Sequence, residues 1–176
     1  VYFKKEIDKI EVEVAFQFVD AFEENILGFC NNIFTQEGGT HLVGFKTRFT
    51  MLINSYAKEL GILKEKDANL SGADIRSGMQ AIISVKHPDP QFEGQTKTKL
   101  SNTDVTKAVD DIVKEQLTVY FDRNYDVLKD ICDRAVSLSK KKALEKSKIN
   151  LNKFSFEGNG KLAKQESNDS SKCEIF

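Results

Sequence analysis

The sequence has little of several residue types on which common sites and frameworks depend. It contains three cysteines, two histidines and no tryptophan among 176 residues. Cys30, Cys132 and Cys173 are odd in number and far apart, so neither a disulfide framework nor a zinc site is indicated. Cys30 and Cys132 lie in apolar patterns, which is typical of small core residues in a reducing compartment. With only His41 and His87, far apart in the chain, a histidine-based metal site is not expected.

Other absences exclude whole classes of protein. No apolar run approaches the roughly 20 residues that span a bilayer, and the first residues lack the pattern of a signal peptide. The formal net charge is −1, so any attraction to nucleic acid or to a membrane must come from a local patch. Neither a Ser/His/Asp order nor a Walker-type glycine loop is visible.

What is present indicates a folded protein. Hydrophobic residues make up 40% of the chain and aromatic residues 10%, which is enough to argue against global disorder. A length of 176 residues suits one domain with a core of its own, with room for an appendage.

Four segments are expected to form β-strands. Residues 1–5 (VYFKK) and 9–19 (KIEVEVAFQFV) flank a turn near Asp8, and apolar residues alternate with polar ones in the second segment. This period of two predicts a strand with one buried face. Residues 24–34 (ENILGFCNNIF) and 79–87 (MQAIISVKH) are the other two, and the last, being the most apolar, is expected at the centre of the sheet.

Two helices are expected from apolar residues that recur at intervals of three and four. The first stripe covers residues 42–60 and predicts a helix that ends at Gly61. The second stripe covers residues 105–120. Before it, Ser101 and Asp104 have the spacing of a variant capping box, with Asp in place of the usual Glu.

A third helix is expected to be capped by Asn124, with an apolar face between residues 128 and 138. Residues 139–153 (SKKKALEKSKINLNK) are polar and basic, and they either prolong this helix or fray. Residues 157–176 (EGNGKLAKQESNDSSKCEIF) are rich in glycine and small polar residues, which is typical of a linker or the edge of another domain. The tail 153–176 is expected to be extended and irregular.

These elements predict an α+β fold. It consists of a roughly four-stranded, mostly antiparallel sheet covered by helices. One βαβ crossover joins the third strand to the fourth, and the general rule for such units predicts a right-handed connection.

Residues 35–41 (TQEGGTH) join a predicted strand to a predicted helix. Two adjacent glycines permit backbone conformations closed to other residues, and Thr40 is placed to cap the helix. One interpretation is a tight turn with a cap, and the other is an anion held at the helix N-terminus.

Residues 91–100 (QFEGQTKTKL) follow a loop that contains both prolines. Gly94 provides a hinge, and in an extended loop Gln95 and Lys97 point the same way, so that both can grip one phosphate. The alternative is an ordinary solvated loop. A basic cluster further along, Lys140, Lys141, Lys142, Lys146 and Lys148, either contacts phosphate backbones or forms a solvated helix face.

Three segments closely resemble, in the same order, the transducer domain of the ATPase subunit of type IIA topoisomerases. They are residues 31–46 (NNIFTQEGGTHLVGFK), 86–100 (KHPDPQFEGQTKTKL) and 160–164 (GKLAK). Residues 63–100 look more like the gyrase B subunit than like its topoisomerase IV counterpart. The resemblance covers residues 1–140 well and the remainder more loosely.

The resemblance implies a role for the QTK triplet. In this family its glutamine and lysine reach a neighbouring Bergerat-fold ATPase domain and contact the γ-phosphate of ATP, and these positions match Gln95 and Lys97. Lys97 is thereby implied to be catalytic. The fold of the family also implies a left-handed βαβ crossover in place of the right-handed one.

The resemblance further implies residues that face DNA. Basic transducer residues of the family line a cavity for the transported DNA segment, and Lys46 stands where the family commonly has Arg. Arg48 is a second candidate, because Met51 occupies a position that is often basic. Lysines of the later segment replace an arginine-rich helix, namely Lys140, Lys141, Lys142 and Lys146.

The resemblance divides the chain into a transducer domain at residues 1–150 and a linker with the truncated start of a Toprim domain at 151–176. ATP and Mg²⁺ are implied for the full-length protein only. The fragment alone is expected to hold neither, to bind no metal and to be inactive.

The implied parent is an ATP-hydrolysing DNA gyrase that introduces negative supercoils. Its implied partners are double-stranded DNA, its own ATPase and Toprim domains, and the gyrase A subunit, in a heterotetramer of two A and two B subunits. No membrane partner is expected. The alternatives are a decatenating topoisomerase IV and a stand-alone module that binds anions or nucleic acid. The expected location is the cytoplasm, at the nucleoid, or a plastid-type organelle.

Overall fold

The computed structural model describes the backbone of residues 1–158 and the side chains of residues 1–145. The chain separates into two compact units, Val1–Ser139 and a second unit that begins at Lys140. The expected domain boundary at residue 150 stays a prediction. Most of the expected linker and Toprim start, residues 159–176, lies outside the described residues.

The main sheet has five strands where about four were expected, and it is mostly antiparallel as expected, with one parallel pair. Its order is β1 (Tyr2–Ile7), β2 (Ile10–Phe18), β6 (Met79–Lys86), β3 (Asn25–Cys30) and β4 (Ile33–Phe34). The pairs β1–β2, β2–β6 and β3–β4 are antiparallel, whereas β3 and β6 are parallel. The sheet is therefore mixed, with β6 at its centre as its apolar sequence predicted.

The additional strand comes from a tight turn inside the segment expected to be one strand. Asn31 and Asn32 have φ of 48° and 64°, the two positive values that a two-residue hairpin turn requires. The turn folds β4 back onto β3. Asp8 and Lys9, with φ of 52° and 64°, make the same kind of connection between β1 and β2, where a turn was predicted.

A second, three-stranded sheet was not predicted. It has the order β5 (Gly38–Gly39), β8 (Lys99–Leu100) and β7 (Phe92–Glu93). β5 and β8 are parallel, and β7 and β8 form an antiparallel hairpin. Strands of two residues carry no periodic signal, so only contacts between distant segments define them.

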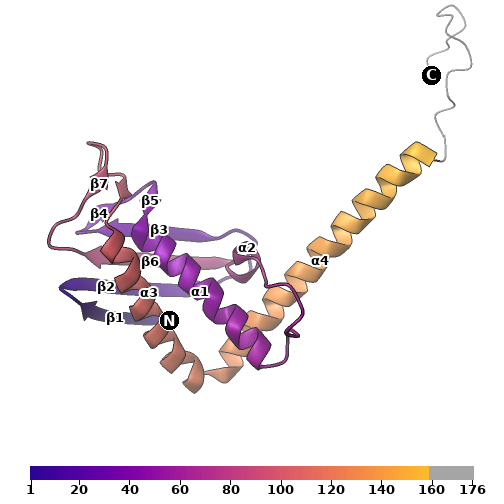
Figure 1. The fold of residues 1–176 in the computed structure, drawn as a ribbon, viewed down its shortest axis with the longest axis horizontal. Helices are drawn as coiled ribbons and strands as arrows, with labels where there is room; N and C mark the ends of the chain where they lie inside the picture. The colour runs from indigo at the N-terminus through magenta and orange to yellow at the C-terminus, as the bar shows by residue number, and fades with distance from the viewer. Residues whose placement is uncertain (159–176) are drawn as a thin grey trace, which may run out of the picture. The chain divides into compact units, whose positions relative to one another are not determined.

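The helices are α1 (Thr40–Glu59), α2 (Gly72–Ile75), α3 (Thr103–Arg123) and α4 (Tyr125–Gly158). Figure 1 shows α1 and α3 side by side across the main sheet. The segment from α1 through α2 joins the parallel strands β3 and β6 and is the expected βαβ crossover. The left-handed sense of this connection stays a prediction. α2 was not predicted, and residues 153–158 are helical, so the expectation of an extended tail is wrong for them.

The core lies between the main sheet and α1 with α3. Val12, Val14 and Phe16 of β2 are buried, as are Phe45 and Phe49 of α1. The ring centroids of Phe16 and Phe49 lie 5.6 Å apart in an edge-to-face arrangement. The apolar alternation of β2 and the helical stripe of α1 thus meet in one cluster, as both periods predict.

The two long helices approach closely at Gly44 of α1. A Cβ there would lie 2.8 Å from the carbonyl oxygen of Thr106 in α3. Real Cβ atoms do not come so close to a backbone oxygen, so any larger residue would push the helices apart.

The expected end of α1 is confirmed, and α4 begins directly after Asn124 as expected, but the expected cap of α1 by Thr40 is wrong. Gly61, at φ 69°, donates its N–H to the carbonyl of Lys58. Thr40 is already inside α1, and its buried hydroxyl has no hydrogen-bond partner among the side chains and backbone that the structure describes. The side chain of Asn124 donates 2.8 Å to the carbonyl of Tyr120 at the end of α3.

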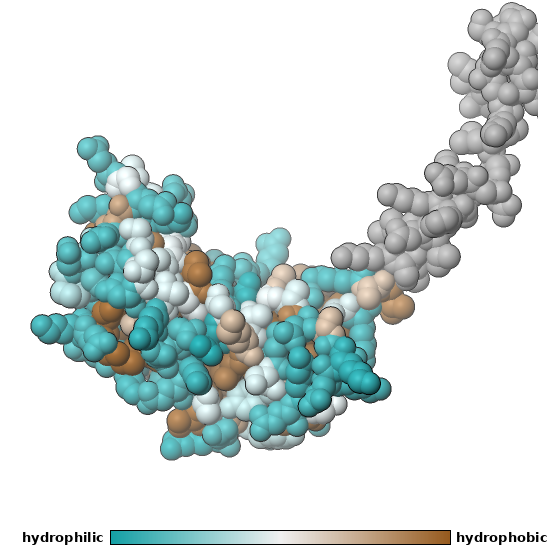
Figure 2. All heavy atoms as spheres, in the orientation of Figure 1, coloured by the Kyte–Doolittle hydropathy of each residue, from teal (hydrophilic) through white to brown (hydrophobic). Residues whose placement is uncertain are grey.

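The surface view in Figure 2 is mainly hydrophilic, with apolar side chains scattered over it. None of the helices described within residues 1–158 is both long enough and apolar enough to span a bilayer.

Candidate functional site

The QTK triplet lies at the tip of the β7–β8 hairpin. Phe92 pairs with Leu100 and Glu93 with Lys99, so residues 94–98 form the connection. Gln95 and Lys97 are exposed. Figure 1 shows this hairpin projecting past the strands of the main sheet, which makes its tip accessible to a partner surface.

The backbone of the tip is turned, not extended. Gly94 has φ 77° and Lys97 has φ 53°, and residues 94–97 are in turns. The expectation that Gln95 and Lys97 point the same way rested on an extended loop, and that premise is wrong here. The chain reverses within five residues to pair β7 with β8, which an extended segment cannot do.

The two lysines of the hairpin differ in their electrostatic surroundings. Lys99 lies opposite Glu93, with 2.9 Å between its Nζ and the Glu93 Oε2. Within residues 1–145, whose side chains are described, Lys97 makes no ion pair. Lys97 therefore offers a positive charge that is not already neutralised.

His87 holds the chain just before the hairpin. Its backbone N–H donates to the Asn31 Oδ1 (2.9 Å), and its Nδ1 accepts from the Asp89 N–H (3.0 Å). Because Nδ1 accepts, the ring proton is on Nε2, which lies 3.0 Å from the Asp104 Oδ2 and donates to it. This hydrogen bond is the main cause that lowers the pKa of Asp104.

The glycine pair of residues 35–41 serves packing. Gly38 and Gly39 are buried and have φ of 76° and 137°. A Cβ on Gly39 would lie 2.3 Å from the carbonyl oxygen of Leu100. The close approach of β5 to β8 requires glycine at this position, which favours the structural interpretation of the segment.

The two candidate DNA-facing residues of α1 are already paired with acids. The Lys46 Nζ lies 2.7 Å from the Glu24 Oε1, and Glu24 also binds Arg76 at 2.6 Å. Arg48 binds both carboxylate oxygens of Asp110, with its Nε 2.8 Å from Oδ1. Both cations are partly neutralised within the fold.

Lys140, Lys141 and Lys142 are exposed on α4 in the second unit. The side chain of Lys146 lies outside the described residues. The candidates on α1 and those on α4 therefore belong to different units.

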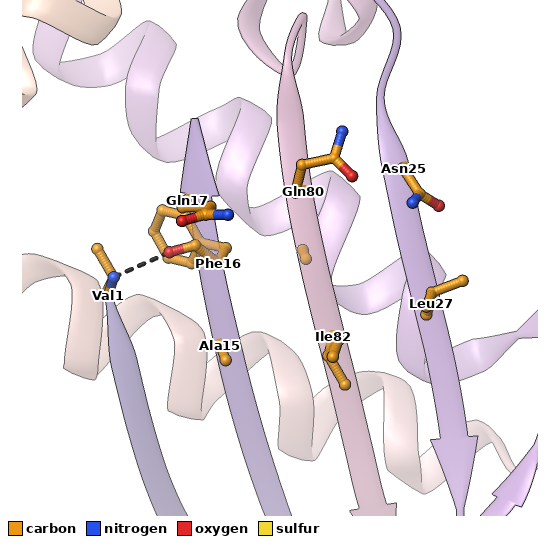
Figure 3. Close-up of a pocket in the computed structure, with 9 residues that line it drawn as sticks. Val1, Ala15, Phe16, Gln17, Asn25, Leu27, Gln80 and Ile82 are labelled. Carbon is orange, nitrogen blue, oxygen red and sulfur yellow. Dashed lines mark hydrogen bonds between the residues drawn. The ribbon is translucent and has the colours of Figure 1, made fainter. Parts of the chain in front are cut away.

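A shallow hollow of about 380 Å³ lies on the face of the main sheet opposite the helices (Figure 3). Its lining includes the amides of Gln17, Asn25 and Gln80 and the apolar side chains of Leu27 and Ile82. The backbone nitrogen of Val1 also borders it and donates to the Phe16 carbonyl at 2.8 Å. None of the described side chains that line it is acidic, basic or nucleophilic.

Other chemistry is limited in the described part of the chain. Among those residues, no group of three or more His, Cys, Asp or Glu could hold a metal ion. Burial raises the pKa values of the Cys30 and Cys132 thiols to about 11, so both stay protonated at neutral pH. The expected role of both as small core residues is confirmed by their burial.

Comparison with known families identifies relatives. A family model described as DNA gyrase B matches residues 1–150. The chain is 48% identical to the DNA gyrase B protein of Clostridium acetobutylicum and 44% identical to that of Haloferax lucentense, over its whole length in both cases. It spans 29% and 28% of those two proteins, less than a third of their length.

Solved structures agree with these relatives. The 43K ATPase domain of Thermus thermophilus gyrase B is 33% identical, with a TM-score of 0.79 over 86% of this chain and 40% of that one. The topoisomerase IV ATP-binding domain of Francisella tularensis is 28% identical, with a TM-score of 0.70 over 81% of this chain and 40% of that one. The match over residues 1–150, together with the fold shared with these ATPase regions, shows that the chain belongs to the DNA gyrase B family.

Proposed function

We propose that this chain is the transducer segment of a DNA gyrase B protein. The full-length protein would be an ATP-hydrolysing type IIA topoisomerase that introduces negative supercoils together with a gyrase A subunit. The observation that carries the proposal is the exposed β7–β8 hairpin with an unneutralised Lys97 at its tip, in a chain that the DNA gyrase B family model matches over residues 1–150.

Gln95 and Lys97 would contact the γ-phosphate of an ATP held with Mg²⁺ in another domain. The amide of Gln95 can donate to a phosphate oxygen, and the Lys97 ammonium places fixed positive charge where negative charge gathers during phosphoryl transfer. The contact exists only while the γ-phosphate is attached, so its loss on hydrolysis can be relayed to the rest of the protein.

The proposal extends to DNA. Lys46, Arg48 and the lysines of α4, including Lys146, would face the transported duplex. To bind phosphates, Lys46 and Arg48 would have to give up their ion pairs with Glu24 and Asp110, which reduces their net contribution to the free energy of DNA binding. The exposed Lys140 and Lys141 would add their positive charge to this surface.

The test is Lys97→Ala in the full-length protein. Loss of one transition-state contact of this kind typically costs about 3–4 kcal/mol, or roughly 10²–10³ in rate. ATP affinity should change far less, because the adenine, sugar and Mg²⁺ contacts lie elsewhere. Lys99→Ala is the matched control, since it removes a lysine two residues away that is engaged with Glu93.

Turnover, nucleotide affinity and supercoiling are measured for both variants. Normal hydrolysis and supercoiling by Lys97→Ala would show that residues 94–98 are a solvated loop. The similarity to a topoisomerase IV structure supports one alternative, a protein that decatenates DNA without supercoiling it. Assaying the full-length protein with its partner subunit on closed circular DNA tests for supercoiling and so distinguishes the two.

A further inference from the structure

A set of polar side chains ties down the segment that carries the hairpin. This segment leaves β6 after Lys86 and returns to α3 at Thr103. We call the set the loop clasp, and it consists of Asn31, His87, Asn102 and Asp104. Its members come from the β3–β4 turn, the end of β6 and the start of α3.

Asn102 makes the most direct contacts with the segment. It is buried, with an exposed fraction of 7%. Its Oδ1 accepts from the Gln91 N–H at 2.6 Å, and its Nδ2 donates to the Asp89 carbonyl at 3.1 Å. One side chain thus pairs with both a donor and an acceptor of the backbone immediately before β7.

Asn102 makes these contacts at the expense of its usual role. It occupies the N-cap position of α3, where asparagine ordinarily accepts from a helix N–H, yet it makes no capping hydrogen bond. The expected capping box of Ser101 and Asp104 also fails, because Ser101 donates to the Gln91 carbonyl at 3.0 Å and Asp104 accepts from His87. Ser101 and Asn102 are therefore turned toward the hairpin segment, whereas Asp104 binds His87 through Oδ2 and accepts from the Val105 N–H of α3 through Oδ1 (2.9 Å).

His87 and Asn31 hold the other side of the segment. Besides accepting from the His87 N–H, Asn31 donates from its Nδ2 to the His87 carbonyl at 2.8 Å. The His87 ring connects the Asp89 N–H to Asp104, which lies in the first turn of α3. Residues 87–91 are thus held from both the β3–β4 turn and α3.

We propose that Asn102 is a positioning residue for Gln95 and Lys97, and that the loop clasp couples the hairpin to the start of α3. This inference rests on the proposed function. A charged group must be held within a fraction of an ångström of its productive place to act on a transition state, because small misplacements forfeit most of the rate gain. The clasp supplies that constraint from outside the exposed tip.

The experiment compares Asn102→Ala and the isosteric Asn102→Asp with Lys97→Ala in the full-length protein. Asn102→Ala should lower the turnover number by about 10- to 100-fold, the scale of a misplaced catalytic group, with nucleotide affinity within about twofold. Asn102→Asp keeps the acceptor for the Gln91 N–H and loses the donor to Asp89, so its turnover should lie between those of wild type and Asn102→Ala.

Two controls separate positioning from stability. Ser101→Ala removes one hydroxyl from the Gln91 carbonyl, which still accepts from the Ser101 N–H, and should hydrolyse ATP at the wild-type rate. Asn54→Ala removes another buried asparagine, far from the hairpin in sequence, which holds Leu70; it should lower the unfolding temperature without changing turnover.

The outcomes are distinguishable. If Lys97→Ala is fully active, the proposed function itself is wrong. If Lys97→Ala is impaired but Asn102→Ala turns over normally, only the positioning role is overturned. Equal losses in Asn54→Ala and Asn102→Ala would show a purely structural effect and would also overturn it.

Discussion

His41 shows how a single residue can be committed to packing rather than chemistry. It is fully buried, and its Nε2 lies 3.1 Å from the Thr35 Oγ1. Thr35 donates its own proton to the Gly28 carbonyl, so His41 must donate from Nε2. Its Nδ1 is then unprotonated and buried, and no residue in the described part of the chain donates to it. Burial lowers the pKa of His41 to about 4.

This pKa predicts a pH dependence of stability. The folded pKa of about 4 lies below the ordinary value of 6.5, so between these values the unfolded chain binds more protons. The contribution of His41 to the free energy of unfolding should therefore be complete above about pH 6.5. The free energy of unfolding should then fall by up to about 3 kcal/mol as the pH is lowered to 4. Urea unfolding of this chain at several pH values measures the loss.

The two histidines provide a matched comparison. His41→Gln retains a donor for Thr35 but cannot titrate, so this part of the pH dependence should disappear. His87→Gln should leave it in place. An unchanged slope in His41→Gln would mean that another group causes the acid loss.

At the scale of elements, one side chain holds a loop against a helix. Asn54 of α1 is buried, and its Nδ2 donates 3.1 Å to the Leu70 carbonyl while its Oδ1 accepts 2.8 Å from the Leu70 N–H. The connection between α1 and α2 is thereby fastened to α1 by a pair of bonds that resembles strand pairing.

Asn54→Ala should destabilise the fold by about 2–4 kcal/mol, because it leaves a backbone donor and acceptor of Leu70 without partners. Asn69→Ala, an exposed asparagine in the same connection, should change stability by less than about 0.5 kcal/mol. Denaturant midpoints of both variants give the comparison. Equal stability of the two would show that Leu70 finds water or other partners.

The basic part of α4 leads to a prediction for DNA binding by the full-length protein. Each phosphate contact contributes about 0.9 to the slope of log K against log salt for duplex DNA. Replacing Lys140 and Lys141 by Ala should therefore reduce that slope by up to about 1.8. Replacing the exposed Lys64 and Lys66 should leave it unchanged. Identical slopes for both double variants would remove α4 from the proposed DNA-facing surface.

At the scale of the whole molecule, the chain represents less than a third of the gyrase B proteins to which it is similar. The residues proposed to reach ATP are two side chains on one exposed hairpin. We expect the 176-residue chain alone to hydrolyse no ATP and to bind nucleotide weakly, because two contacts do not offset the lost freedom of a bound nucleotide. Calorimetry with a non-hydrolysable ATP analogue checks this, and micromolar binding would contradict it.

Much of the fold could be predicted where the pattern is local. The alternation in β2, the helical stripes of α1 and α3, the turn at Asp8 and the end of α1 at Gly61 all form as expected. The split of the third strand at Asn31 and Asn32 was missed, although two adjacent asparagines are a signal for a hairpin turn. The two-residue strands and α2 were too short to produce any period.

The candidate site was predictable only in its exposed part. Gln95 and Lys97 stand in a recognisable triplet, but Ser101 and Asp104 were interpreted through helix capping and Asn102 was not singled out. Nothing local to residues 101–104 indicates that their side chains turn to residues 87–91, because that choice depends on where β6 ends and how α3 packs.

The amino-acid sequence alone is enough to predict which segments become long strands and helices, and which residues lie at the hairpin tip. Those features follow from the spacing of apolar residues within each segment and from local turn conformations, which need no contact with the rest of the chain. The packed fold is needed to set β3 and β6 parallel, to pair Lys46 with Glu24 and Arg48 with Asp110, and to bring Asn102 to the loop. Each of these is a pairing between groups distant in the chain, and a polar side chain takes whichever partner the packed fold brings within reach.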